Sequence, residues 1–449
     1  MPHELDQILI SSSQPDFEKR LGDLRRKKAP RGRFPGYDSP ESISVLEILR
    51  YVGERGDNAI RDYTKKYDDA DLEPDEFRVS SRDLEKAHKQ VDEELLKSIR
   101  QAIENVKRYQ KEIFIGKERA CTGGTAIKYN PIKRIGICVP GAAAPLPSTV
   151  IMTAVPAIVA GVKPKNIIVV SPPRYKSNPQ DKGTIHPVTL AVCHELGIKE
   201  VYRIGGAQAV AALASEKSSI PKVDKIVGPG NLWVQTAKKM VSQDYVAIDS
   251  IAGPSEVLII ANDKANPAWV AADMLSQAEH ASDSTAIVLT DSETFAKQTL
   301  EELKKQLREL SRAEQAKQSL LALGAIVVLN GMTEVIDLAN DLAVEHLQIQ
   351  CGNESREIAE KIENAGAIFI GDYTPVAVGD YWAGPSHTLP TEMRAKFSSA
   401  LTSNDFIKSI SIIEYDKEKL TACADDIVRL AETEGLDAHA KSVKIRQTK

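Results

Sequence analysis

The spacing of apolar positions changes near residue 134. Before it, "SISVLEILRYVGERGDNAIRDYTKKY" and "DLEKAHKQVDEELLKSIRQAIENVKRYQKEI" mix apolar and charged residues at helical spacing, which predicts packing helices. After it, short apolar runs such as "RIGICV", "NIIVVS" and "DKIVG" alternate with helical stretches, and "EVLIIA", "TAIVLT", "AIVVLN" and "AIFIG" form a second set. Such alternation is typical of parallel strands joined by helical crossovers. The sequence therefore predicts two α/β sheets in tandem.

The length of 449 residues favours two or three domains in place of one core. We expect α/β domains with parallel-rich sheets, and small helical elements at both ends. The last segment mixes one strand, "SISIIEY", with one charged helix. The expected divisions are a helical extension, a discontinuous first α/β domain, a second α/β domain and a small C-terminal domain: 1–30, 31–133 with 256–397, 134–255, and 398–449.

Composition excludes several classes of function. A net charge of −5 and a pI near 6 give no general attraction to nucleic acid or anionic membranes. The five cysteines lie far apart without a CxxC pair, which is typical of a reduced, cytoplasmic protein. No uninterrupted apolar run approaches the length of a membrane span, and the first residues lack the pattern of a signal peptide. We therefore expect a cytoplasmic protein that acts on a small molecule.

Elimination among the eight histidines leaves four candidates for chemistry. A catalytic histidine usually sits at the end of an element or in a loop beside glycine or another polar residue. Four do not fit this description: His3, His88, His186 and His194. Four do: His280, His346, His387 and His439. A hydrogen-bonded structural role is the ordinary alternative for each of them taken alone.

The run "ANPAWVAADMLSQAEH" reads as an amphipathic helix that ends on polar residues. Gln277 and His280 are three apart, so they share one helix face and can bind one object. Together with His439 and an acidic residue such as Asp380, they would supply nitrogen and oxygen ligands without cysteine. That set is typical of a catalytic zinc site. It forms only if the fold brings these distant positions together.

Glu345 and His346 in "LAVEHLQIQ" are neighbours that offer a carboxylate and an imidazole. On a regular strand adjacent side chains point to opposite faces, so both reach one substrate only from a turn or a strand end. There, each group can carry a proton. A plain strand edge is the alternative.

Three glycine-rich stretches each follow an expected strand and open a helix: "VPGAAAPLPSTV", "RIGGAQAV" and "VGPGNLWV". Backbone N–H groups at helix N-termini suit a pyrophosphate. None of the stretches matches GxGxxG, and close packing of helix on strand explains them as well.

Taken together, the chain resembles the histidinol dehydrogenase family over nearly its whole length. The resemblance is carried by ordered blocks that include "GGAQAVAALA", "VDKIVGPGNLWV", "DSIAGPSEVLIIA", "NDLAVEHLQIQ", "GDYTPVAVGDYWAGPSHTLPT" and "EGLDAHAKSVKIR". It implies two Rossmann-like domains and a homodimer with sites shared between subunits. It also implies oxidation of L-histidinol through L-histidinal to L-histidine, with one Zn²⁺ per subunit and two NAD⁺ reduced.

The resemblance also assigns roles to individual positions. It implies that the zinc ligands, which also meet the substrate, are Gln277, His280, Asp380 and His439. It implies Glu345 and His346 as the acid–base pair, His346 again in contact with substrate. The further substrate contacts it implies are Ser148, Ser255, His387 and Glu434. The implied NAD contacts are Gln208, Asn231 and the position of Cys138.

The chain departs from the common family pattern at two places in the expected NAD site. Cys138 stands where a tyrosine is frequent, and Ala142 stands where a second glycine is usual. One alternative is a relative that oxidises another small alcohol, such as a sulfonated diol. An anionic substrate of that kind would favour Arg or Lys in place of Glu434, so Glu434 and His387 favour the amino-imidazole substrate. A nucleotide-binding scaffold without activity would not be expected to keep all the candidate ligands.

Overall fold

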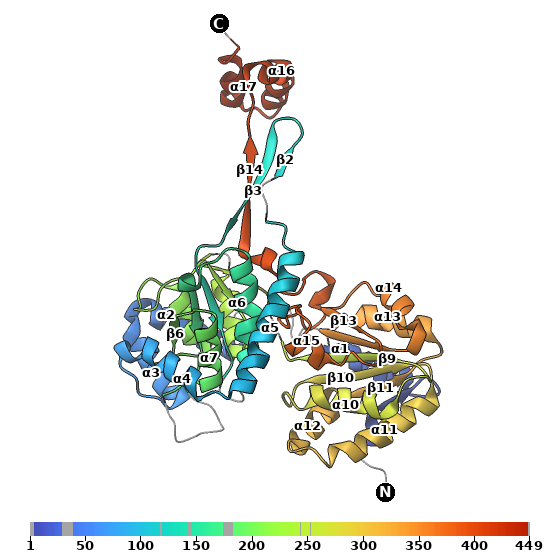
Figure 1. Ribbon diagram of the computed structural model, residues 1–449. Helices are drawn as coiled ribbons and strands as arrows, with labels where there is room; N and C mark the ends of the chain where they lie inside the picture. Colours follow the sequence, from blue (N-terminus) through green and yellow to red (C-terminus); the bar gives the residue numbers. More distant parts are fainter. Residues whose placement is uncertain are drawn as a thin grey trace. The chain divides into compact units, whose positions relative to one another are not determined.

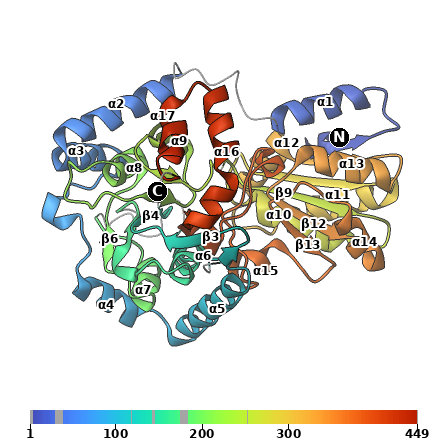
Figure 2. The same cartoon turned by 90° about the horizontal axis from the view of Figure 1, so that it is seen from above.

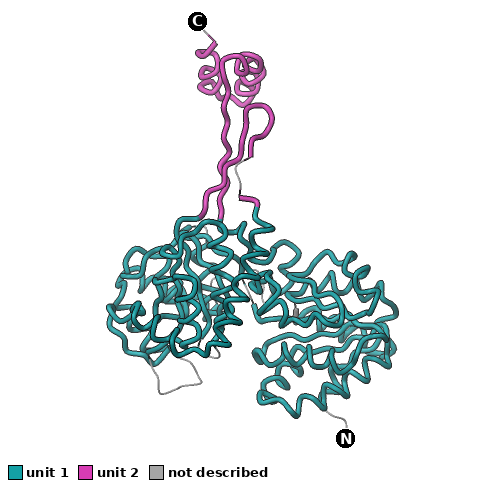
Figure 3. The backbone as a smooth tube through the Cα atoms, in the orientation of Figure 1, with its two compact units in different colours: residues 1–114, 132–406 teal, residues 115–131, 407–449 magenta. Residues whose placement is uncertain are grey.

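The computed structural model describes residues 4–28, 39–116, 119–141, 145–173, 183–242, 244–251 and 253–447. The chain forms two compact units (Figure 3). The first comprises Met1–Phe114 and Ile132–Phe406, and the second comprises Ile115–Pro131 and Ile407–Lys449. Ala142, one of the two positions that depart from the family pattern, lies outside the described residues.

A six-stranded parallel sheet forms one half of the first unit (Figure 1). Its strands run in the order β1-β11-β10-β9-β12-β13. Their bounds are β1 Leu9–Ser11, β9 Glu256–Ala261, β10 Thr285–Thr290, β11 Ala325–Val328, β12 His346–Gln350 and β13 Ala367–Ile370. The central strands β9 and β10 are buried along their whole length, as expected for a parallel sheet covered on both faces.

Helices cover both faces of this sheet. They are α1 Phe17–Lys28, α10 Pro267–Ala278, α11 Glu293–Leu307, α12 Ala313–Leu323, α13 Met332–Leu342, α14 Ser355–Glu360 and α15 Val376–Tyr381. Alternate residues of β9 belong to separate cores: Val257 and Ile259 pack with α10, α11 and α12, whereas Leu258 and Ile260 pack with α1, α13 and α14. The period of two along the strand thus produces two apolar cores.

A five-stranded parallel sheet forms the other half of the first unit, in the order β6-β5-β4-β7-β8. Its strands are β4 Ile135–Cys138, β5 Ile167–Val170, β6 Glu200–Tyr202, β7 Lys225–Val227 and β8 Ala247–Ile248. The connecting helices are α6 Pro147–Val159, α7 Pro187–Glu195, α8 Gly206–Ala214 and α9 Leu232–Val241. The chain builds outward from β4 to β6 and then returns to the other side of β4 with β7. The gap between the ends of β4 and β7 is therefore the topological switch point, where doubly wound sheets bind ligands.

The two charged N-terminal runs fold as four helices: α2 Pro40–Arg55, α3 Asp57–Asp68, α4 Ser81–Gln90 and α5 Glu93–Glu112. α2 and α3 are separated at Gly56, which has a left-handed φ of 55°. α2 and α3 pack on α8, α4 packs on α7, and α5 packs on α6 (Figure 2). These helices were expected to group with residues 256–397; they pack mainly on helices of the five-stranded sheet, although Asn105 of α5 also donates a hydrogen bond to the carbonyl oxygen of Trp382. The amphipathic pattern predicts an apolar face, but not which sheet covers it.

The second unit contains a three-stranded antiparallel sheet and two helices. Its strands β2 Arg119–Cys121, β3 Thr125–Pro131 and β14 Ile407–Ile413 run in the order β14-β3-β2. The helices α16 Lys417–Thr433 and α17 Asp437–Lys444 pack on each other. The strand and charged helix expected near the C-terminus are therefore present. β14 pairs with residues 125–131, which were expected in another domain.

Short 3-10 helices complete the described elements: η1 Glu4–Ile8, η2 Pro74–Glu76, η3 Pro164–Asn166, η4 Gly352–Glu354, η5 Arg394–Lys396 and η6 Ser403–Phe406. The expected α/β class with parallel-rich sheets is confirmed. Within the described residues, no helix has both the length and the apolar character needed to cross a membrane. The detailed domain boundaries stay a prediction.

Candidate active site

The end of α10 presents two of the expected metal ligands. Asn266 caps the start of this helix, and Met274 lies on its buried face. Gln277, in the last turn, is only 2% exposed, and its Nε2 has no hydrogen-bond partner among the described residues. His280 follows the helix with its Nδ1 2.8 Å from the carbonyl oxygen of Ser276. Because a carbonyl only accepts, Nδ1 donates this hydrogen bond, and Nε2 is the ring nitrogen that could bind a ligand.

Glu345 and His346 lie where the chain enters the six-stranded sheet. After α13, Ala343 has a left-handed φ of 43°, and β12 begins only at His346. The Oε2 of Glu345 accepts hydrogen bonds from the hydroxyl of Ser255 at 2.6 Å and from the N–H of Glu256 at 2.8 Å. The Nδ1 of His346 donates to the carbonyl oxygen of Glu256 at 2.9 Å. The strand end thus brings both side chains to the first residue of β9.

A cavity of about 130 Å³ lies beside His346. Its walls include Phe369, Asp380 and His387. The Nε2 of His346 lies 3.7 Å, and the Nδ1 of His387 4.0 Å, from the same Oδ1 of Asp380. Within the described part of the chain, the Nε2 atoms of both histidines are buried without a hydrogen-bond partner. The cavity wall therefore offers two imidazole nitrogens and a carboxylate to a bound molecule.

The charges around this cavity act on one another. Burial by itself lowers the pKa of His346, but the carboxylates of Glu345 and Asp380 outweigh burial and raise it to about 10. Burial lowers the pKa of His387, and the attraction of Asp380 only partly opposes this. Burial raises the pKa of Asp380, whereas the neighbouring histidines, His280 among them, bring it below its usual value. His280 is thus close enough to Asp380 for their charges to interact.

Glu256 is a site residue that is not among those predicted from the sequence. Its carboxylate accepts hydrogen bonds from the N–H of Glu345 at 3.3 Å and from the N–H of Glu392 at 3.1 Å. Glu392 and Met393 have left-handed φ values of 52° and 62°, which are strained for residues other than glycine. Glu256 therefore ties a strained loop to Glu345. The sequence feature that could have indicated Glu256 is a carboxylate at the start of the apolar run "EVLIIA". A buried charge needs hydrogen-bond partners, so such a residue is expected to contact polar groups.

The expected zinc ligands come from both units. Gln277, His280 and Asp380 belong to the first unit, whereas His439 lies on α17 of the second. Glu434, an expected substrate contact, follows α16 in that same second unit, and both Glu434 and His439 are exposed. The described residues contain no group of three or more His, Cys, Asp or Glu side chains arranged to hold a metal. The complete ligand set therefore stays a prediction.

The expected NAD contacts lie at the carboxyl edge of the five-stranded sheet. Cys138 is the last residue of β4, and burial raises the pKa of its thiol to about 12. Gln208 lies in the first turn of α8, 2% exposed, with an Nε2 that has no partner among the residues described. Asn231 caps α9 by accepting a hydrogen bond from the N–H of Val234 at 3.2 Å. Cys138 and Asn231 lie at the ends of β4 and β7, on either side of the switch point, whereas Gln208 follows β6 at the edge of the sheet.

Ser148, an expected substrate contact, lies in the first turn of α6 and is buried. One turn later, the carbonyl oxygen of Met152 accepts a hydrogen bond from the hydroxyl of Ser386 at 3.0 Å. Ser386 lines the cavity next to His387. The helix that carries Ser148 is thus joined to the cavity wall.

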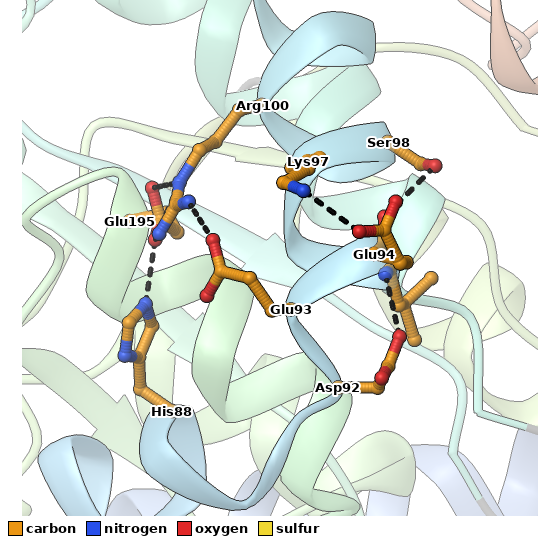
Figure 4. Close-up of polar contacts among 9 residues, drawn as sticks. His88, Asp92, Glu93, Glu94, Lys97, Ser98, Arg100 and Glu195 are labelled. Atoms are coloured by element: carbon orange, nitrogen blue, oxygen red, sulfur yellow. Dashed lines mark hydrogen bonds and ion pairs between the residues drawn. The ribbon is translucent and has the colours of Figure 1, made fainter.

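Among the histidines set aside, His88 has a structural role (Figure 4). Its Nε2 lies 2.5 Å from Oε1 of Glu195, and Arg100 donates to both carboxylate oxygens of Glu195. These residues come from α4, α7 and α5, so the cluster joins three packed helices. His186 caps α7 by accepting a hydrogen bond from the N–H of Val188 at 3.3 Å.

The fold and the site define an α/β protein with two parallel sheets and a buried acid–base pair beside a cavity. Residues 38–447 match the family described as histidinol dehydrogenase. The chain is 46% identical over 407 residues to the histidinol dehydrogenase of Oceanobacillus iheyensis, covering 90% of this chain and 92% of that one. It is 43% identical over 450 residues to that of Rhodopirellula baltica, covering 97% and 95%.

A crystal structure of histidinol dehydrogenase from Elizabethkingia anophelis has a similar fold, with a TM-score of 0.88 at 35% identity. The match covers 99% of this chain and 98% of that one. The chain therefore belongs to the histidinol dehydrogenase family, and it is an oxidoreductase.

Proposed function

We propose that the protein oxidises L-histidinol through L-histidinal to L-histidine, the last steps of histidine biosynthesis, and reduces two NAD⁺ with the help of Zn²⁺. The observation that carries the proposal is the buried pair Glu345 and His346 at the start of β12. His346 lines a cavity together with Asp380 and His387. The names of the relatives support the substrate. Glu434 favours a substrate with a cationic amine over an anionic alcohol.

His346 suits the role of base in the first oxidation. An aliphatic hydroxyl is a very weak acid, so its proton must be removed as the hydride leaves for NAD⁺. The Glu256 carbonyl holds Nδ1 of His346, which leaves Nε2 at the cavity. Glu345 is the larger cause of the raised pKa of His346, and a divalent cation bound to Asp380 would offset the part that comes from Asp380. The pKa would then move toward the range of a base that works at neutral pH.

Glu345 suits the second oxidation. The aldehyde must add water and lose a second hydride to another NAD⁺, and the proton released from water needs an acceptor near the same carbon. Glu345 adjoins His346, and the hydroxyl of Ser255 and the N–H of Glu256 fix its Oε2. We assign water activation to this carboxylate.

The residues of the first unit fit part of a zinc site. Nδ1 of His280 bonds to Ser276, so Nε2 is the nitrogen that could bind a metal; Gln277 has a buried side-chain amide whose Nε2 lacks a partner among the described residues and whose oxygen could be a ligand. With Asp380 they provide nitrogen and oxygen donors, and His439 would be the fourth ligand. Zinc bound there would hold the imidazole and amine nitrogens of the substrate, and so fix the reacting carbon relative to the nicotinamide.

The carboxyl edge of the five-stranded sheet fits a dinucleotide. Gly206 has a left-handed φ of 67° at the start of α8, and the nearby Gln208 has a buried Nε2 with no partner in the described part of the chain. A dinucleotide that also reached Cys138 and Asn231 would extend to the switch point between β4 and β7, where backbone N–H groups at helix starts favour a pyrophosphate. Cys138 supplies a neutral thiol at this edge, because burial raises its pKa.

We further propose a homodimer in which the second unit of each chain completes the site of the other. The second unit carries Glu434 and His439 together. It also exposes large apolar side chains, among them Ile413 and Ile445 at 75% and 70%. Exposed apolar surface of this kind is typical of a contact with a partner. A cytoplasmic location stays an expectation from the sequence.

A steady-state assay of the purified protein tests the proposal. NADH formation is followed with L-histidinol and NAD⁺ before chelation, after it, and after zinc is added back. We expect activity that chelation removes and zinc restores. A sulfonated diol is the control substrate. Turnover of the diol without turnover of L-histidinol would contradict the proposal.

A further inference from the structure

Lys238 on α9 and Asp249, which follows β8, form an ion pair that is buried in the first unit. Their side chains are 0% and 4% exposed, and Nζ of Lys238 lies 2.5 Å from Oδ1 of Asp249. The free energy lost when two charges are removed from water offsets much of their attraction. An apolar pair of similar size would therefore often stabilise the fold equally well. The pair therefore calls for an explanation beyond stability.

Both charges bind the backbone of one residue, Gly228. The Oδ2 of Asp249 accepts a hydrogen bond from the N–H of Gly228 at 2.7 Å, and Lys238 donates to its carbonyl oxygen at 2.9 Å. Gly228 has a left-handed φ of 105°, and a Cβ there would lie 2.4 Å from the carbonyl oxygen of Cys138. Lys238 also donates to the carbonyl of Ser250 at 3.1 Å. An apolar pair would supply none of these hydrogen bonds.

The turn that begins at Gly228 is fixed at its other end too. Asn231 caps α9, and the side-chain amide of Gln235 donates to the carbonyl oxygen of Gly230 at 3.3 Å. Lys238 also lies on α9. This helix therefore fixes both ends of the turn: Lys238 bonds to Gly228, and Asn231 caps the helix. Residues 228–231 thus form a turn whose backbone is set by buried groups on α9 and after β8.

This turn follows β7 and faces the end of β4, which is the switch point of the sheet. We propose that Lys238 and Asp249 are positioning residues that hold residues 228–231 in the shape that receives a pyridine dinucleotide. The inference rests on the NAD dependence proposed above. Neither residue touches the reacting atoms. Their effect is on cofactor binding through Gly228 and Asn231.

Two variants test the role of the pair. Asp249→Asn keeps the shape but replaces one acceptor oxygen by a donor, so either the N–H of Gly228 or Nζ of Lys238 loses its acceptor. The double variant Lys238→Met with Asp249→Leu removes both charges, so no buried charge is left unpaired. Lys304→Met is the control, because Lys304 pairs with Asp6 and Glu301 beside the six-stranded sheet.

Each protein is measured by fluorescence titration with NADH, by L-histidinol binding, by zinc content and by thermal unfolding. Hydrogen exchange of residues 228–235 reports on the turn itself. We expect NADH to bind roughly tenfold or more weakly to both pair variants, because small displacements of a binding group are costly. Exchange in the turn should be faster, with zinc content and L-histidinol binding kept. Lys304→Met should bind NADH normally.

A folded pair variant that binds NADH as tightly as the unaltered protein would overturn the inference, and so would a lower melting temperature as the only change. Equal weakening of NADH and L-histidinol would also overturn it, because that result indicates general loss of structure. Failure of the unaltered protein to bind NADH would instead overturn the proposed function on which the inference rests.

Discussion

Nδ1 of His346 is hydrogen-bonded to the backbone, and Nε2 lies beside a cavity. The proposed role of His346 as a base can be tested by substitution. Replacing His346 by Asn removes the base but keeps a polar side chain that fills most of the space. We expect the rate of L-histidinol oxidation to fall roughly 10²- to 10⁴-fold, the usual contribution of a general base. Zinc content, measured by metal analysis, should stay the same.

Glu345→Gln is the matched comparison, because it changes the charge of the neighbour and keeps its shape. The second oxidation should slow more than the first. The variant should therefore lose more of its rate with supplied L-histidinal than with L-histidinol, each compared with the unaltered protein. Equal slowing of the two substrates would show that Glu345 does not serve the aldehyde step.

Glu256 gives a separate prediction, because its carboxylate faces two N–H donors. Glu256→Gln replaces one acceptor oxygen by a donor, so either Glu345 or Glu392 loses its partner. We expect a lower kcat, with NADH affinity unchanged, because the change disturbs the acid–base pair and leaves the five-stranded sheet intact. Glu354→Gln is the control, since Glu354 pairs with exposed Lys264. An unchanged kcat in Glu256→Gln would remove Glu256 from the site.

At this scale the sequence predicts chemistry better than contacts. Glu345 and His346 could be proposed as a pair from the sequence because they are adjacent, and both reach one substrate if they lie at the end of a strand. The sequence allows a strand end at this position, but it does not predict the left-handed φ of Ala343. Glu256 was missed because its two hydrogen bonds join residues 89 and 136 positions away. Such partners follow from the fold and not from spacing.

At the scale of elements, α4, α5 and α7 are joined by the cluster in Figure 4. Hydrogen bonds from Arg100 lower the pKa of Glu195; burial opposes them, and His88 adds to the lowering. A carboxyl whose pKa is lowered on folding stabilises the protein above its ordinary pKa, and this contribution is lost as the pH falls through the folded-state pKa.

Glu195→Gln should therefore lower the melting temperature at neutral pH. The difference from the unaltered protein should shrink as the pH falls toward about 3, below the ordinary glutamate pKa. Glu94→Gln, which removes an exposed pair with Lys97, should have little effect at any pH. A difference in melting temperature that stays constant with pH would show that charge at Glu195 is not the cause.

Strands were easier to predict than the grouping of helices. "EVLIIA" and "TAIVLT" coincide with β9 and β10, because buried parallel strands read as continuous apolar runs. The helices between residues 40 and 112 have clear apolar faces, yet either sheet would satisfy such a face. The same limit applies to β14, whose pairing with β3 joins residues far apart in the chain.

At the scale of the whole molecule, the proposed sharing of sites can be tested by mixing two inactive variants. One carries His346→Asn and the other His439→Ala. If His439 serves the site of the other subunit, each mixed dimer has one intact site and one site with both changes. Random exchange of subunits should then restore about a quarter of the original activity, since half of the dimers are mixed. Sites built within single chains would give no recovery beyond the sum of the separate variants.

The central claim is a four-electron oxidation of L-histidinol, and its most direct test is the yield of NADH from a limiting amount of L-histidinol with excess NAD⁺. Each oxidation passes one hydride to NAD⁺. We predict about two NADH for each L-histidinol consumed, with L-histidine as the product and no NADH after the metal is removed by chelation. One NADH for each L-histidinol, with L-histidinal accumulating, would contradict the account.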